Sequence, residues 1–153
     1  MYRQAGSDVG TSYTVVDVNG TRLMPAKELM FPTGYAWDPG GTKVVFTGHS
    51  LQPSSSATGV GPAIFWLFDT EAGGTAQTIA RYKNTMVQSI SWSPDGESIA
   101  WAEYDPKKEW RTGNVFVMSA SGGDARVLAK EALSPVWAPG AAVTLQTSPS
   151  SSP

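Results

Sequence analysis

The sequence predicts an all-β fold made of antiparallel four-stranded sheets. Its 153 residues include 16 glycines and 11 prolines, whereas charged residues make up only 16% of the chain. This composition favours many tight turns and little exposed helix, because surface helices are normally rich in lysine and glutamate. In addition, a tryptophan-centred segment occurs three times, and short apolar runs recur in the same order between its copies. The length is sufficient for one domain with a hydrophobic core.

The tryptophan-centred repeat is clearest at residues 34–47 and 89–102, which align without a gap. Trp37 and Trp92 occupy the same place in these two copies. The third copy keeps the Trp-x-Pro pattern at Trp137 but is shorter after the proline. The spacing of the three tryptophans is close to the ~40–50 residue period of β-propeller blades, each of which is a four-stranded antiparallel sheet.

Further strand signals follow the first two tryptophans. The apolar runs at residues 64–69 and 115–119 suit strands that are buried on both faces. Each run is followed by a glycine-containing turn and a more polar fourth strand. Two whole four-strand units are therefore predicted, at residues 34–81 and 88–129.

The ends of the chain are expected to hold incomplete units. Asn19-Gly20 lies between two apolar segments and predicts a hairpin at residues 13–24, which would form the last two strands of a unit. Residues 134–147 are expected to supply the first two strands of a final unit. Residues 48–62 lack apolar periodicity and predict a long loop inside the first whole unit. The predicted division is an N-terminal extension at residues 1–12, propeller blades at residues 13–147 and a disordered Ser/Pro tail at residues 148–153.

The residues around each tryptophan are expected to be structural. Trp92, with Ile90 on the same face of its strand, is large and rigid enough to pack between adjacent twisted sheets. In the Ser-Pro-Asp-Gly turn that follows, proline presets φ, aspartate caps backbone amides and glycine takes a positive φ. We therefore expect the three repeat tryptophans to be buried at equivalent places. The residues assigned to packing and turn geometry rather than to chemistry are Trp37, Asp38, Pro39, Trp92, Pro94, Asp95, Gly96, Trp137 and Pro139.

The sequence Ile-Ser-Trp-Ser-Pro-Asp-Gly at residues 90–96, followed by apolar strands at 99–101 and 115–118, resembles the repeat of the TolB-like β-propeller family. The resemblance covers about residues 13–140. It implies a ring of about six blades, which three blade-equivalents do not close alone. Either the chain is part of a longer protein, or the half-blades at its ends pair between copies and a homodimer forms a six-bladed ring. The resemblance also suggests a periplasmic or other extracytoplasmic location, although the N-terminal residues do not form a signal peptide.

Composition and motifs argue against several functions. The formal net charge of −2 provides no basic surface for phosphates, so a nucleic-acid partner is not expected. The absence of cysteine excludes disulfides, thiolate metal sites and a cysteine nucleophile. No apolar stretch reaches the ~20 residues of a membrane span, so insertion into a membrane is not expected. The scattered carboxylates and the single histidine, His49, define no metal, cofactor or catalytic site, and no Gly-x-Ser-x-Gly motif is present.

The loops after the second strands of the two whole units form the predicted binding surface. The loop containing His49 and the loop that begins at Tyr104 occupy the same place in successive units, so they should emerge on the same face. Tyrosine, tryptophan and arginine are frequent at the energetic centres of protein interfaces. Ordinary packing of Trp110 and a solvated His49 are the alternatives. The candidate protein-interface residues are His49, Tyr104, Lys107, Lys108, Trp110 and Arg111.

The sequence thus favours a non-catalytic propeller scaffold that mediates protein-protein interaction or assembly through loops on one face. The alternative is a propeller fragment of a prolyl-oligopeptidase-like serine peptidase, or of another hydrolase, whose catalytic domain lies outside this sequence. Both functions follow from likeness at the level of the fold, since no catalytic residue is assigned.

Overall fold

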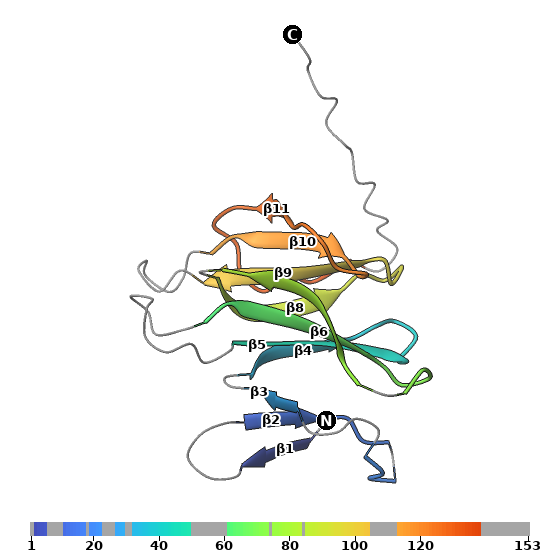
Figure 1. Ribbon diagram of the computed structural model, residues 1–153. Helices are drawn as coiled ribbons and strands as arrows, with labels where there is room; N and C mark the ends of the chain where they lie inside the picture. Colours follow the sequence, from blue (N-terminus) through green and yellow to red (C-terminus); the bar gives the residue numbers. More distant parts are fainter. Residues whose placement is uncertain are drawn as a thin grey trace.

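The computed structural model describes residues 2–5, 11–17, 19–22, 27–29, 32–49, 61–73, 75–83, 85–104 and 113–138. Within these ranges the regular secondary structure is β-strand, arranged in three antiparallel sheets that lie one above another (Figure 1). Two of the sheets have four strands each. The predicted all-β fold of antiparallel four-stranded blades is therefore confirmed.

Each complete sheet is a meander, in which strands that are adjacent in sequence pair with each other. The register places Trp37 opposite Val44 in one sheet and Trp92 opposite Ile99 in the other, so the two repeats are structurally equivalent. The first complete sheet consists of β4 (Pro32–Trp37), β5 (Lys43–His49), β6 (Ala63–Asp69) and β7 (Gln77–Tyr82). The second consists of β8 (Met86–Trp92), β9 (Ser98–Tyr104), β10 (Val115–Ser119) and β11 (Arg126–Ala129).

A three-stranded sheet precedes the complete ones and comprises β1 (Tyr2–Ala5), β2 (Thr11–Thr14) and β3 (Lys27–Leu29), in that order. The hairpin turn predicted at Asn19-Gly20 is present: Gly20 has a φ of 82°, and its N–H donates to Asp17 O at 3.1 Å. The strands differ from the prediction, because the hairpin strands are β2 and β3 and a further strand, β1, lies in the segment expected to be an extension. The sequence of β1 is short and mostly polar, and pairing with β2 rather than apolar periodicity defines it.

Hydrophobic side chains are buried between neighbouring sheets. Because side chains alternate between the two faces of a strand, β5 directs Val45 toward the second complete sheet and Val44 and Phe46 toward the N-terminal sheet. All three are fully buried. The core between the complete sheets also contains Phe65, Val87, Trp92, Ile99, Trp101 and Met118.

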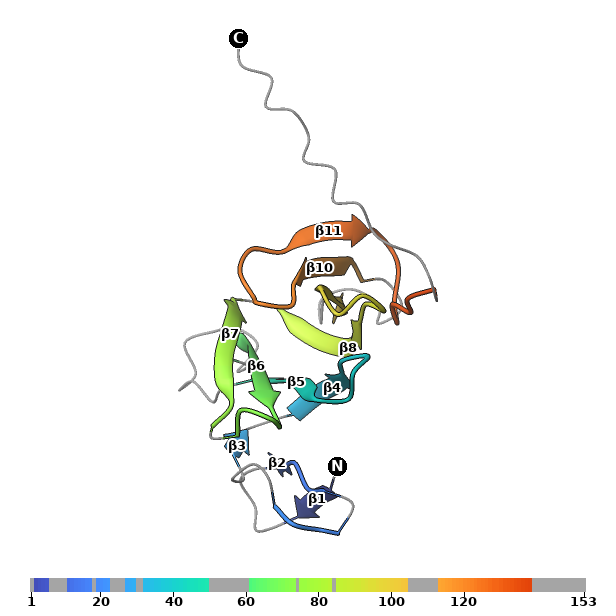
Figure 2. The same cartoon turned by 90° about the vertical axis from the view of Figure 1, so that its right-hand side faces the viewer.

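An aromatic group centred on Trp101 joins the two complete sheets (Figure 2 shows their packing in side view). The Trp101 ring lies 4.9 Å from Phe65 and 5.2 Å from Tyr82, both of the first sheet, and 5.6 Å from Phe116 of its own sheet. The Tyr82 hydroxyl donates to Gly123 O at 2.7 Å. Burial, together with the Asp124 carboxylate, raises the pKa of Tyr82 to about 12, so this hydroxyl remains a donor.

The three repeat tryptophans are not equally buried. Trp92 is 8% exposed, whereas Trp37, in the equivalent register, is 37% exposed. Trp92 packs against a complete sheet. Trp37 faces the N-terminal sheet, from which Val15 is the one described residue in the buried core. Trp137 is half-buried, and its indole N–H donates to Ser91 O of β8 at 3.3 Å. The expectation that all three tryptophans are buried is therefore wrong for Trp37.

After β11 the described chain continues to Ala138 without forming a strand. Glu131 and Ser134 have φ values of 53° and 55°, and this left-handed backbone interrupts an extended conformation. The segment is held by the N–H of Ala132, which donates to Gly113 O at 2.9 Å, and by the Trp137 indole. The first strand expected from residue 134 onward is absent as far as Ala138, because the segment has no strand beside it to complete a ladder. Pro139, the remainder of residues 139–147 and the predicted tail at 148–153 lie outside the described residues.

Candidate binding edge

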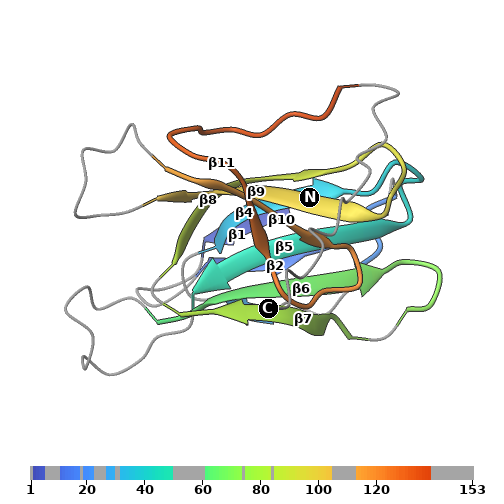
Figure 3. The same cartoon turned by 90° about the horizontal axis from the view of Figure 1, so that it is seen from above.

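Each complete sheet has two different ends. At one end, short turns join β4 to β5, β6 to β7, β8 to β9 and β10 to β11; we call this the turn edge. At the other end, β5 leads to β6 through residues 50–62, and β9 leads to β10 through residues 105–114; we call this the long-connection edge. Figure 3 shows the strands of both sheets running between these two ends.

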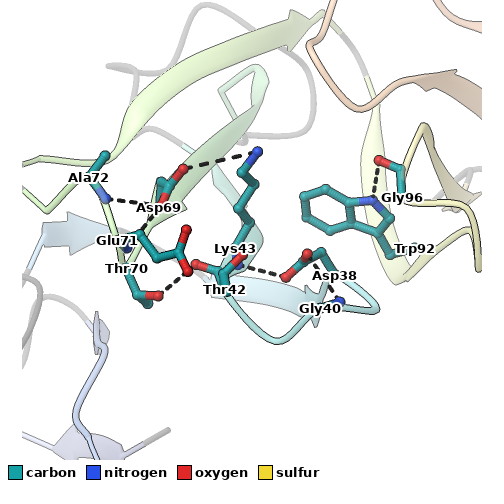
Figure 4. Close-up of polar contacts among 10 residues, drawn as sticks. All are labelled: Asp38, Gly40, Thr42, Lys43, Asp69, Thr70, Glu71, Ala72, Trp92 and Gly96. Carbon is teal, nitrogen blue, oxygen red and sulfur yellow. Dashed lines mark hydrogen bonds and ion pairs between the residues drawn. The ribbon is translucent and has the colours of Figure 1, made fainter.

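At the turn edge of the first sheet, carboxylates cap the backbone of their own turns (Figure 4). Asp38 accepts hydrogen bonds from the N–H groups of Lys43 and Gly40, at 2.6 and 3.2 Å. Asp69 accepts from two N–H groups of the next turn, at 2.9 and 3.1 Å, and lies 4.0 Å from the Lys43 ammonium. The N–H of Ala72 contributes most to holding the pKa of Asp69 below its usual value.

The turn edge of the second sheet is arranged in the same way. Asp95 Oδ1 accepts from the Ser93 hydroxyl at 2.5 Å and from the Glu97 N–H at 2.9 Å. The Ser93 hydroxyl, followed by the Glu97 N–H, lowers the pKa of Asp95. The Trp92 indole donates to Gly96 O at 3.0 Å and closes the turn (Figure 4). These polar groups are used within the turns, so the turn edge has a structural role.

The long-connection edge contains two of the predicted interface residues. His49 is the last residue of β5 and Tyr104 is the last residue of β9, and each closes a seven-residue strand that starts at the same point of its repeat. The two residues therefore lie at equivalent strand ends in neighbouring sheets. The other predicted interface residues, Lys107, Lys108, Trp110 and Arg111, lie outside the described residues.

His49 differs from the solvated loop residue that the sequence suggested. It belongs to β5, pairs with Ala63 of β6 and is only 2% exposed. Its Nδ1 donates to Gly61 O at 3.2 Å, while its Nε2 is buried without a hydrogen-bond partner among the described residues. Burial lowers the pKa of His49, against the opposing effect of the Gly61 carbonyl. His49 therefore fixes the base of residues 50–62 and does not itself form a surface contact.

The buried His49 predicts a loss of stability in mild acid. With its pKa below 6.5 in the folded state, the unfolded chain binds more protons between the two pKa values, so stability falls as pH decreases through this range. Denaturant midpoints at about pH 7 and about pH 5.5 should show this loss in the wild type and a smaller one in His49→Asn, which retains a donor for Gly61 O. An equal pH dependence in the two proteins would contradict this assignment, because His49 is the only histidine.

The base of the second long connection is fixed by groups that the sequence did not single out. The N–H of Glu103 donates to Asn114 O at 2.8 Å, and the Glu103 carboxylate accepts from the Thr85 hydroxyl at 3.2 Å. A Cβ at Gly113 would collide with the carbonyl oxygen of Glu103, so only glycine fits there without displacement. The glycine is visible in the sequence, but its close approach to Glu103 depends on pairing that no local pattern encodes.

The described part of the chain contains no group of three or more His, Cys, Asp or Glu side chains able to hold a metal ion. Across the same ranges, no helix is long and apolar enough to cross a membrane. The one histidine is buried, and its described hydrogen bond is to a backbone carbonyl. The site therefore consists of anchored strand ends rather than of an arrangement of reactive groups.

No established protein family and no curated protein matches this sequence. Solved structures do match the fold. A prolyl endopeptidase is similar over 82% of this chain and 18% of its own, with 18% identity and a TM-score of 0.57. Kuenenia stuttgartiensis hydrazine synthase is similar over 79% of this chain and 36% of its own, with 18% identity and a TM-score of 0.52. The chain thus spans about a fifth to a third of these proteins.

TolB from Acinetobacter baumannii also matches, over 78% of this chain and 26% of its own, with 18% identity and a TM-score of 0.49. This score is too low to support an argument about family or function. The likeness to the prolyl endopeptidase, whose matching part is a propeller domain, shows a propeller-type fold for this chain. At 18% identity it shows the fold alone.

Proposed function

We propose that this chain is a non-catalytic binding module, in which propeller blades present the long-connection edge to a protein partner. The observation that carries the proposal is the equivalence of the two long connections, which leave neighbouring sheets at the same end. Their bases are fixed by the bond from His49 to Gly61 and by the bond from Glu103 to Asn114. A rigid scaffold that presents variable segments in this way is a common construction for binding sites.

The contrast between the two edges supports this assignment. At the turn edge, Asp38, Asp69 and Asp95 are engaged by N–H and hydroxyl groups of their own turns. A partner that competed for these carboxylates would have to break hydrogen bonds that stabilise the sheets. The long connections offer Tyr104, Trp110 and Arg111, which are residue types that contribute strongly to protein interfaces.

Quantitative affinity capture from the native cell tests the binding role. The wild type should retain a defined set of proteins that the variant carrying Tyr104→Ala, Trp110→Ala and Arg111→Ala retains at least ~10-fold less, because truncating interface centres removes most of the binding energy. The matched control carries Glu71→Ala and Glu97→Ala, both exposed at the turn edge. Identical sets for all three proteins, or a loss confined to the turn-edge control, would show that the long-connection edge is not the binding surface.

A second candidate is the propeller part of a prolyl-oligopeptidase-like peptidase, and the likeness to a prolyl endopeptidase favours it. In prolyl endopeptidases, inter-domain dynamics have a role in catalysis and specificity. In this case the blades would act on substrate access, and the reacting groups would belong to another domain. Continuation of the gene beyond residue 153 into an α/β-hydrolase sequence would favour this candidate over the binding module.

A further inference from the structure

The N-terminal sheet contains the second, third and fourth strands of a blade and lacks the first. Its last strand, β3, leads directly into β4, just as β7, the last strand of its sheet, leads into β8. Asp17, after β2, caps its turn by accepting from the N–H groups of Asn19 and Thr21, both at 2.8 Å. Asp69 caps the turn that follows the third strand of the first complete sheet in the same manner. Therefore β2 is a third strand, and β1 beside it is a second strand.

The C-terminal segment at residues 134–138 occupies the place of a first strand. Trp137 stands in the repeat where Trp37 and Trp92 end the first strands of the complete sheets. Its indole donates to Ser91 O of β8, so the segment lies beside the first strand of the preceding sheet. The first strands β4 and β8 lie next to each other in the same way: a Cβ at Gly34 would be 3.3 Å from Ile90 Cγ2. The segment has the position of a first strand without the strands that would complete its sheet.

These two incomplete pieces complement each other. The N-terminal sheet provides three strands and the C-terminal segment provides the missing one, so each chain carries the strands of three four-stranded blades. The two pieces lie at opposite ends of the stack of sheets (Figure 1), with both complete sheets between them. They are therefore placed to meet between chains.

We infer that two copies of this chain close head to tail into a six-bladed ring, in which residues 134–138 of each copy supply the first strand of the blade formed by β1, β2 and β3 of the other. Two copies of three blades fall within the 4–8 blades of known propellers, whereas three blades alone would have to bend too sharply. This assembly does not depend on the proposed role of the long-connection edge, because its contacts lie between blades.

The repeat register specifies the contacts of this interface. Gly34, three residues before Trp37, contacts Ile90, two residues before Trp92. By the same rule, Ser134 of one copy should contact Tyr35 of the other, and Val136 should lie near Trp37. Val136 is 88% exposed and Trp37 is 37% exposed, which are unusual values for apolar residues at first-strand positions. The ring would bury both.

The chain contains no cysteine, so single-cysteine variants allow a clean test. Native mass measurement should give twice the mass of one chain. A mixture of the Ser134→Cys and Tyr35→Cys proteins should form a disulfide-linked dimer under oxidising conditions, whereas neither protein alone should do so, because each contact joins residue 134 to residue 35. A monomeric mass at all concentrations, or a dimer whose mixed variants do not cross-link, would overturn the inference.

A pair of charge substitutions provides the matched control. Val136→Asp places a charge in the inferred interface and should weaken dimerisation by roughly tenfold or more, because an unpaired charge is costly to bury. Val127→Asp makes the same change on β11, where the valine is 46% exposed and outside the inferred contacts, and should leave dimerisation unchanged. Equal effects of the two variants would place the dimer contact elsewhere. Variants of the long-connection edge should not alter the mass, so failure of the binding role and failure of the ring are distinguishable.

Discussion

Replacing Trp92 with alanine is expected to lower the free energy of unfolding by about 3–5 kcal/mol, the range for truncating a large buried aromatic residue. Trp92 is 8% exposed, lies in the core between the two complete sheets and donates a hydrogen bond to Gly96 O. Its removal would leave a cavity between the sheets and one backbone carbonyl without its donor. Chemical denaturation of the purified protein measures the change.

Trp37 provides the control, because it has the same position in the repeat and is 37% exposed. Trp37→Ala should cost about half as much as Trp92→Ala or less, since part of the ring remains in water in the folded state. Both variants should be compared in the Val136→Asp background, which keeps the chain monomeric if the inferred ring forms. Equal losses for the two tryptophans would show that exposure does not distinguish them, and the assigned packing would be wrong.

The second large effect is expected at Gly122, in the turn between β10 and β11. Gly122 has a φ of 93°, and a Cβ on it would collide with the carbonyl oxygen of Ile79 in β7 of the neighbouring sheet. Gly122→Ala therefore combines backbone strain of about 1–2 kcal/mol with an overpacking cost of about 1–3 kcal/mol. Denaturation midpoints should fall accordingly.

The adjacent Gly123 separates these two contributions. Its φ is 105°, but an added Cβ would meet nothing within 4 Å, so Gly123→Ala should show the strain without the collision. The difference between the two variants then measures the contact of this turn with β7. If Gly123→Ala destabilises the protein as much as Gly122→Ala, the sheets are not in close contact at this turn.

The alternation and the tight turns of the two complete sheets were predictable, because they depend on neighbouring residues. The pairing of Trp37 with Val44 and of Trp92 with Ile99 follows from the turn between them, which is encoded locally. The exposure of Trp37 was not predictable from the same pattern, because it depends on the sheet that faces it. Identical sequence positions therefore acquire different burial at the end of a stack and in its middle.

Two other differences have the same origin in long-range pairing. His49 follows Gly48 and precedes a segment without apolar periodicity, yet β5 continues to His49 because Ala63 pairs with it across the sheet. The strand β1 has little apolar content, and its pairing with β2 defines it. The partner strand determines both elements, and a single segment of sequence does not identify its partner.

Of the candidate site, the sequence identified the correct end of the sheets but not the character of His49. The equivalence of His49 and Tyr104 follows from the repeat, so it was accessible to sequence comparison. The burial of His49 follows from its orientation between two sheets, which only the packing determines. The bond from Glu103 to Asn114 likewise depends on the register of β9 and β10, which the long connection between them does not encode.

The burial of β5 on both faces has a consequence for how the protein opens. Val44 and Phe46 belong to one intersheet core and Val45 to the other, so neither core can be exposed to solvent without affecting the same strand. Local openings that expose amides cost most where packing is densest, and they begin at elements covered on one side. Amide protons of β5 should therefore exchange with solvent only when the whole stack opens, and those of β11, whose side chains are largely exposed, should exchange through local fraying.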